Sequence, residues 1–118
     1  MFSIIIPSFN NIDYLKLCIS SLEKNSFYKN EIIVHINIGV DGSTEYLNTK
    51  KIKFSHTSYN SGICEGVNMA SRLASKDYII YAHDDFYFCP NWDKYLFDEI
   101  QLIGHNKFYL SSSTIGTT

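Results

Sequence analysis

The chain has 118 residues, which is enough for one compact domain and too few for two. Its formal net charge of −2 gives no electrostatic basis for binding nucleic acid or an anionic membrane surface. The three cysteines lack the spacing of metal ligands and follow no secretory signal, so we expect free thiols in a reducing compartment. No apolar run approaches the roughly 18 residues needed to span a bilayer.

The first half of the chain alternates strand and helix patterns. Residues 2–10 are an apolar, β-branched run, and we expect this strand to end at Pro7, because proline cannot donate a hydrogen bond to a neighbouring strand. Apolar side chains at helical spacing predict a helix over residues 11–25. The other elements expected in this half are a strand at 31–38, a turn at 39–44 and a strand at 51–58.

The second half continues the alternation. In chain order we expect a loop and helix over 60–75, a strand at 77–82, a helix at 90–104 and a strand at 107–113. Cys18 and Cys64 fall on the apolar faces of predicted helices, and Trp92 is expected to face the core rather than a sugar. The whole pattern predicts an α/β fold whose mostly parallel sheet is covered by helices on both faces.

Polar residues follow several predicted strands, where open α/β sheets bind their ligands. The loops concerned are "PSFN" (7–10), "VDGST" (40–44), "NSG" (60–62) and "HDDF" (83–86). In the last of them Asp84 and Asp85 directly follow an apolar strand, with no nearby basic residue in sequence. Two adjacent carboxylates repel each other, so their position calls for a compensating positive charge.

These loops and their strands resemble those of a family 2 glycosyltransferase. The matching segments are "SIIIPSFN", "EIIVHINIGVDGST", "YNSGICEGVN" and "DYIIYAHDDF". The resemblance reaches to about residue 95 and implies the nucleotide-sugar-binding portion of a GT-A fold, a Rossmann-like three-layer α/β/α sandwich. The sequence stops after a predicted strand, so we expect one domain over 1–118, truncated at its C-terminus and without the acceptor-binding part.

The resemblance implies an inverting, metal-dependent transfer of a sugar from a nucleotide-sugar to an unknown acceptor, with a UDP-sugar as the expected donor. Nucleotide-binding residues carried over from the family are Pro7, Phe9, Asp41, Asn60 and Gly62. Phe9 would stack on the base, and the Asp41 carboxylate would accept a hydrogen bond from the base. The structural alternatives are that Phe9 is a core aromatic at the end of a strand and that Asp41 forms a turn with Gly42.

By the same resemblance Asp84 approaches the ribose, and Asp85 binds a divalent cation that bridges the two phosphates. Oxygen ligands favour a hard ion, so Mn²⁺ or Mg²⁺ is the expected cofactor. His83 is either a further Mn²⁺ ligand or, as we expect, a neutral residue of the pocket wall. The structural alternative for the acidic pair is two solvated carboxylates in a turn. The chain departs from the family at Val40 and Val67, where an Asp and an Arg are common.

The general base of the transfer lies well beyond the metal motif in this family, so the catalytic residue is unknown in this chain. Asp93, Asp98 and Glu99 are expected to be exposed on a helix. We therefore predict nucleotide binding with little or no transfer. The alternative is a non-catalytic nucleotide-binding or assembly module. A sugar nucleotidyltransferase and a dinucleotide-binding domain fit less well, because no Gly-rich phosphate loop follows a strand.

The expected partners follow from these interpretations. They are a nucleotide-sugar donor, an acceptor that is a saccharide, lipid or protein, and a second copy of the chain paired through an exposed sheet edge. Nucleic acid is not an expected partner. The expected location is the cytoplasm, with or without peripheral contact with the inner face of a membrane.

Overall fold

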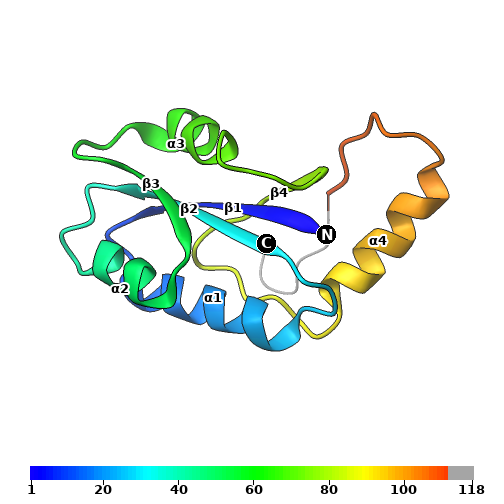
Figure 1. Cartoon of the computed structure of the whole chain (residues 1–118), viewed down its shortest axis with the longest axis horizontal. Coiled ribbons are helices and arrows are strands. Elements are labelled where there is room, and N and C mark those ends of the chain that lie inside the picture. The colour runs from blue at the N-terminus through cyan, green and yellow to red at the C-terminus, as the bar shows by residue number, and fades with distance from the viewer. Residues whose placement is uncertain (112–118) are drawn as a thin grey trace, which may run out of the picture.

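The computed structural model describes residues 1–111, in which a four-stranded parallel sheet lies between helices (Figure 1). The elements, in chain order, are β1 (Phe2–Phe9), α1 (Ile12–Asn25), β2 (Glu31–Asn37), α2 (Ser43–Lys50), β3 (Lys53–Thr57), α3 (Gly62–Ser71), β4 (Tyr78–Tyr81) and α4 (Trp92–Ile103). The strand order is β3-β2-β1-β4, and every pair is parallel. No helix within residues 1–111 is both long and apolar enough to cross a membrane.

The predicted three-layer α/β/α arrangement is confirmed, because successive residues of β1 are buried under different helices. Ile4 and Ile6 belong to the main core with Leu15 and Ile19 of α1. Ile5 faces the other way and packs with Ile33 of β2 and Ala70 of α3. Figure 1 shows α3 on one side of the sheet and α1 and α2 on the other. A strand covered on both faces reads as an uninterrupted apolar run, as the first strand does.

Pro7 does not end the first strand, contrary to the prediction. β1 continues to Phe9, and Pro7 stays in register with His35 of β2. The Ile5 carbonyl accepts a hydrogen bond from the Ala82 N–H, so the backbone groups of Ile5 point towards β4. Pro7, two residues further on, points the same way but lies beyond the paired residues of β4. Its missing N–H therefore leaves no hydrogen bond of the sheet unmade.

The fourth strand is covered on one face only, so the expectation of a sheet covered throughout on both faces is wrong there. Tyr78 and Ile80 pack against the main core, but Ile79 and Tyr81 are 54% and 42% exposed. The two exposed residues are paired with Ser3 and Ile5 of β1, on the face that α3 covers. α3 packs on β1 and β2 and leaves β4, at the edge of the sheet, uncovered on that face.

Two further elements differ from the sequence-based expectation. Helix α2 was not predicted, because Leu47 is its only buried apolar side chain and a single such residue gives no helical period. The predicted strand at 107–113 is absent over residues 107–111, and its last two residues lie outside the described part of the chain. Phe108 packs against Tyr78, whereas the neighbouring Tyr109 is almost fully exposed. One partly buried aromatic side chain holds this segment against the core, but the segment does not form a strand.

Gly66 lets α3 approach β2 closely. A Cβ at this position would lie 2.6 Å from Cδ2 of His35, which is fully buried beneath the helix. The His35 ring cannot withdraw freely, because its Nδ1 is 2.7 Å from Ser55 Oγ. Burial lowers the pKa of His35, so the ring is neutral at pH 7 and serves as a polar part of the core.

Gly66→Ala is expected to destabilise the fold, because the added methyl group overlaps the fixed His35 ring. Overpacking of this kind costs about 1–3 kcal/mol, partly offset by the roughly 1 kcal/mol by which alanine favours a helix over glycine. Urea denaturation would measure the difference. Asn68→Ala, on the exposed face of the same helix, is the control and should change the free energy of unfolding by no more than about 0.5 kcal/mol. A Gly66→Ala variant that is more stable than wild type by about 1 kcal/mol, as helix propensity alone would give, would contradict the packing described here.

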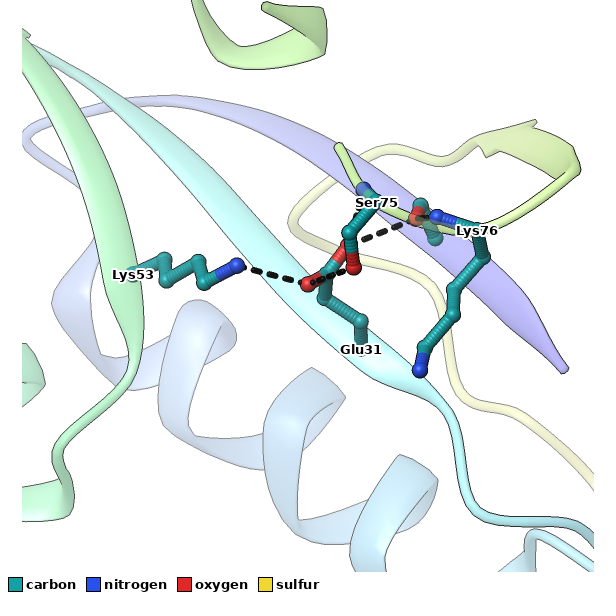
Figure 2. Close-up of polar contacts among 5 residues, drawn as sticks. Glu31, Lys53, Ser75 and Lys76 are labelled. Carbon is teal, nitrogen blue, oxygen red and sulfur yellow. Dashed lines mark hydrogen bonds and ion pairs between the residues drawn. The ribbon is translucent and has the colours of Figure 1, made fainter. Parts of the chain in front are cut away.

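Glu31 joins three strands at the amino end of the sheet (Figure 2). Its carboxylate accepts hydrogen bonds from Ser3 Oγ at 2.7 Å, from Lys53 Nζ at 2.7 Å and from the N–H and Oγ of Ser75 at 2.8 Å each. The Lys76 N–H donates in turn to Ser3 Oγ. Burial by itself would raise the pKa of Glu31, but the hydrogen bonds outweigh it and lower the pKa to about 2.

Glu31→Gln is expected to lower the free energy of unfolding by about 1–3 kcal/mol at pH 7. The native pKa lies below that of an ordinary glutamate, so the contribution is complete above about pH 4.5 and is lost as the pH falls towards 2. The difference between variant and wild type should therefore shrink across that window in urea titrations. Glu23→Gln, which breaks only the exposed ion pair with Lys50, should cost less than about 1 kcal/mol. A pH-independent effect of Glu31→Gln would contradict this account.

Candidate functional site

An open pocket of about 360 Å³ lies at the carboxyl ends of β1 and β2. It is lined by Pro7, Ser8, Phe9, Asn11, Asn37, Asn60, Gly62, Ile63, His83 and Asp84. Five of the residues predicted from the sequence to bind a nucleotide are therefore together: Pro7, Phe9, Asn60, Gly62 and Asp84. Asp41 and Asp85, the other two predicted site residues, do not line this pocket.

Phe9 presents its ring to the pocket. It is the last residue of β1, and its side chain is 48% exposed, in contrast to the seven buried residues before it. The alternative interpretation of Phe9 as a core aromatic is therefore wrong. An exposed ring at the wall of a pocket is free to stack on a flat ligand.

The carboxylate of Asp84 is held against the end of β1. Ser8 Oγ, in a residue that is only 4% exposed, donates a hydrogen bond of 2.8 Å to Asp84 Oδ2. Ser8 was not predicted from the sequence as a site residue, although it stands between Pro7 and Phe9, which were. This contact joins segments 76 residues apart and fixes the position of one acidic side chain at the pocket.

The loop after β4 is fastened along α1. Cys18 Sγ lies 3.7 Å from the His83 carbonyl oxygen, and Ser21 Oγ accepts a hydrogen bond of 2.9 Å from the Phe88 N–H. Asn25 Nδ2 donates to the Phe88 carbonyl at 2.7 Å. These three helix residues are buried and one turn apart, so one face of α1 positions the loop that carries the acidic pair.

Asp93 is fully buried, so its expected exposure is wrong. Its carboxylate accepts backbone hydrogen bonds of 2.8 Å from Phe27 and Tyr28, and one of 2.9 Å from the side chain of Asn30. These donors belong to the loop between α1 and β2, which no sequence pattern places next to Asp93. The carboxylate is thus a structural acceptor.

The other two carboxylates predicted on this helix, Asp98 and Glu99, are exposed as expected. Trp92, on the same helix, packs against Phe2 and Phe88, which confirms its predicted place at the core.

Asp41 forms the turn that was the structural alternative for this residue. Its Oδ1 accepts hydrogen bonds from the N–H and Oγ of Ser43, and its Oδ2 accepts one of 2.9 Å from the N–H of Ile12. Burial alone would raise the pKa of Asp41, but the bonds from Ser43 and Ile12 lower it, so the carboxylate is charged at pH 7. Asp41 thereby connects the first turns of α1 and α2.

His83 forms part of the pocket wall, as expected. Its ring lies between those of Tyr81 and Phe86, with centroid distances of 5.0 and 5.1 Å. In the part of the chain that the structure describes, no three His, Cys, Asp or Glu side chains are grouped so that they could hold a metal ion. His83, Asp84 and Asp85 therefore do not form a ready metal centre.

The acidic pair nevertheless suits one kind of metal binding. Mg²⁺ and Mn²⁺ commonly take one or two protein carboxylates and complete their coordination with phosphate oxygens and water. Asp84 and Asp85 offer oxygen ligands only, and Asp85 is exposed. The donor set thus fits a hard cation that arrives with a phosphate ligand, and it does not fit a closed structural metal site.

Asn37 was also missed by the sequence reasoning. Its Oδ1 accepts hydrogen bonds from the Ser61 N–H at 2.9 Å and from Ser61 Oγ at 2.7 Å, and Thr57 Oγ1 lies at 3.3 Å. The signal in the sequence was faint: one amide at the end of the apolar run "EIIVHIN".

A second pocket of about 400 Å³ lies at the amino ends of β2 and β3, away from these residues. Its acidic side chains, Glu23 and Glu31, are paired with Lys50 and Lys53. None of the predicted site residues lines it, so it is not the candidate site.

Comparisons with known proteins agree on the kind of protein. The sequence model of a family described as "Glycosyl transferase family 2" matches residues 3–111. No curated protein sequence matches the chain.

Several solved structures share the fold, which is the GT-A fold expected from the sequence. TarS of S. aureus is 25% identical with a TM-score of 0.72, covering 86% of this chain and 19% of TarS. Residues 1–349 of TarS in complex with UDP are 24% identical, with a TM-score of 0.73 and coverage of 87% and 32%.

The mannosyltransferase PcManGT from Pyrobaculum calidifontis, in complex with GDP-Man and Mn²⁺, is 15% identical with a TM-score of 0.69. The match covers 80% of this chain and 30% of that enzyme. The chain therefore spans less than a third of the length of each of these proteins.

The reactivity of the three cysteine thiols reports how closely the loop after β4 packs on α1. Cys18 is buried, and burial, followed by the charges of Asp84 and Asp85, raises its pKa to about 12. Cys64 is exposed, so its predicted place on an apolar helix face is wrong, and Cys89 is exposed too.

We expect a disulfide reagent at pH 8 to modify two thiols of the folded chain quickly and Cys18 only after unfolding. In the folded chain at this pH, Cys18 is a thiolate in only about one molecule in ten thousand. Urea-unfolded chain, in which all three should react, is the control. Rapid reaction of three thiols in the folded chain would show that the loop does not cover Cys18.

Proposed function

The chain belongs to glycosyl transferase family 2, and on that premise we propose that its pocket binds the nucleotide of a nucleotide-sugar, with a UDP-sugar as donor. The proposed reaction is inverting transfer of the sugar to an acceptor. The observation that carries the proposal is the convergence of Phe9, Asn60, Gly62 and Asp84 on one pocket, although they come from three separate segments of the chain. Structural relatives bound to UDP and to GDP-Man with Mn²⁺ support it.

Each residue has a role that its surroundings allow. Phe9 stacks on the base, a contact worth about 1–3 kcal/mol per base in single-strand binders. Asn60 Oδ1 accepts the Gly62 N–H at 3.1 Å, which shapes the loop before α3 at the pocket. Pro7 adds an apolar wall. Asp41 does not itself line the pocket, but its charged carboxylate keeps further lone pairs that can accept a base N–H.

Asp84, held by Ser8, is proposed to face the ribose, and Asp85 to hold Mn²⁺ or Mg²⁺. When bound, such a cation would act as a Lewis acid for the departing diphosphate. The repulsion between the two adjacent carboxylates is then offset by a positive charge. His83 closes the pocket beside them without binding the metal.

We propose no general base within residues 1–111. Asp93 is occupied by its hydrogen bonds, and Asp98 and Glu99 are exposed on α4. The 118-residue chain is accordingly proposed to bind the donor without transferring its sugar. The same observation favours the second candidate, a non-catalytic nucleotide-binding module, and transfer from a labelled donor by any protein containing this chain would decide against it. The acceptor, the homodimer and the cytoplasmic location stay predictions.

Calorimetric titration tests the donor site. UDP is expected to bind the chain at least about tenfold more tightly with Mn²⁺ than without it, because the cation joins Asp85 to the diphosphate. Asp85→Asn should abolish this dependence on Mn²⁺. Asp98→Asn, which removes an exposed carboxylate on α4, should leave it unchanged. Equal UDP affinity with and without Mn²⁺ in the wild-type chain would refute the metal-dependent site.

A further inference from the structure

Asn37 is a buried residue whose side-chain oxygen is hydrogen-bonded within the fold and whose side-chain nitrogen is open to the pocket. Its residue is 4% exposed, it ends β2, and it lines the pocket beside Phe9, its register partner on β1. Oδ1 is occupied by the Ser61 donors described above. Nδ2 has no hydrogen-bond partner within residues 1–111. Every side-chain nitrogen or oxygen that is closed off from solvent in this part of the chain has a partner, so Nδ2, which has none, is not closed off from solvent. The open space that Asn37 lines is the pocket.

The orientation of this amide is fixed. A hydroxyl such as Ser61 Oγ can exchange donor and acceptor roles, but the Ser61 N–H can only donate. Rotating the amide by half a turn would set its NH₂ group against that N–H at 2.9 Å and leave two donors facing each other. The part of the Asn37 amide that is exposed to the pocket is therefore always its NH₂ group, a hydrogen-bond donor.

We propose that Asn37 selects the base of the nucleotide by donating a hydrogen bond to an exocyclic carbonyl oxygen. This inference rests on the proposed function and deepens it. Uracil (O4) and guanine (O6) carry a carbonyl where cytosine and adenine carry an amino group. An amide free to rotate would accept from that amino group, whereas the fixed NH₂ of Asn37 meets another donor. A mismatch of this kind leaves buried polar groups unpaired and is rejected strongly.

The test is a calorimetric panel of UDP, GDP, CDP and ADP in the presence of Mn²⁺. All four ligands carry the same diphosphate, so differences between them report on the base. The wild-type chain is expected to bind UDP at least about tenfold more tightly than CDP, or GDP at least about tenfold more tightly than ADP. The panel also shows which of the two carbonyl bases fits beside Phe9.

Asn37→Asp removes the donor while keeping the fold contact. The retained carboxylate oxygen still accepts from Ser61, and an acceptor replaces the amide nitrogen. The added charge weakens all four ligands alike, but the preference for a carbonyl base should fall at least about tenfold. Asn68→Asp is the matched control: it adds the same charge at an exposed position of α3 that does not line the pocket, and should leave the base preference unchanged.

The outcomes separate the two proposals. Binding without base preference, or a preference that persists in Asn37→Asp, overturns the role of Asn37 and leaves the nucleotide site standing. Absence of binding by all four nucleotides overturns the nucleotide site and this inference together. If circular dichroism shows Asn37→Asp to be unfolded, the wild-type panel decides, because equal affinity for UDP and CDP and for GDP and ADP refutes the inference without a variant.

Discussion

The burial of β1 on both faces is the constraint on which the rest of the structure depends. Helices α1 and α3 pack against alternate residues of this strand, on opposite faces of the sheet. Strands β2 and β4 pair with β1 on its two sides. Because all the strands are parallel, the loops that follow them meet at one rim. The carboxyl end of β1 supplies Pro7, Ser8 and Phe9 to that rim, so the same strand organises both the core and the pocket.

Helix α1 positions the loop after β4 in addition to covering the sheet. Its buried polar residues, Cys18, Ser21 and Asn25, hold the irregular loop after β4 through backbone contacts. An irregular segment that carries charged residues gains its fixed course from such contacts, since it has no hydrogen bonds of a strand or helix. The position of Asp84 thus depends on α1 on one side and on Ser8 of β1 on the other.

Beneath the pocket, a group of buried polar side chains is hydrogen-bonded within residues 1–111, with the exception of Asn37 Nδ2. His35 bonds to Ser55, and Asn37 bonds to Ser61 in the loop that leads into α3. Gly66 lets the helix settle directly on this group. The hydrogen bonds of such a buried network hold its members in one geometry, so a ligand in the pocket contacts donors and acceptors at defined positions.

The sequence by itself determined the alternation of strands and helices, the mostly parallel α/β arrangement and the loops that carry Phe9, Asn60 and Asp84, because these follow from local periodicity and from motifs. Only the tertiary structure decided the burial of Asp93, the open face of β4 and the fixed amide of Asn37. Each of these depends on residues distant in sequence: the loop after α1, the reach of α3, and Ser61. Hydrogen-bond partners across the fold leave no periodic trace in a sequence, so they become visible only once the chain is folded.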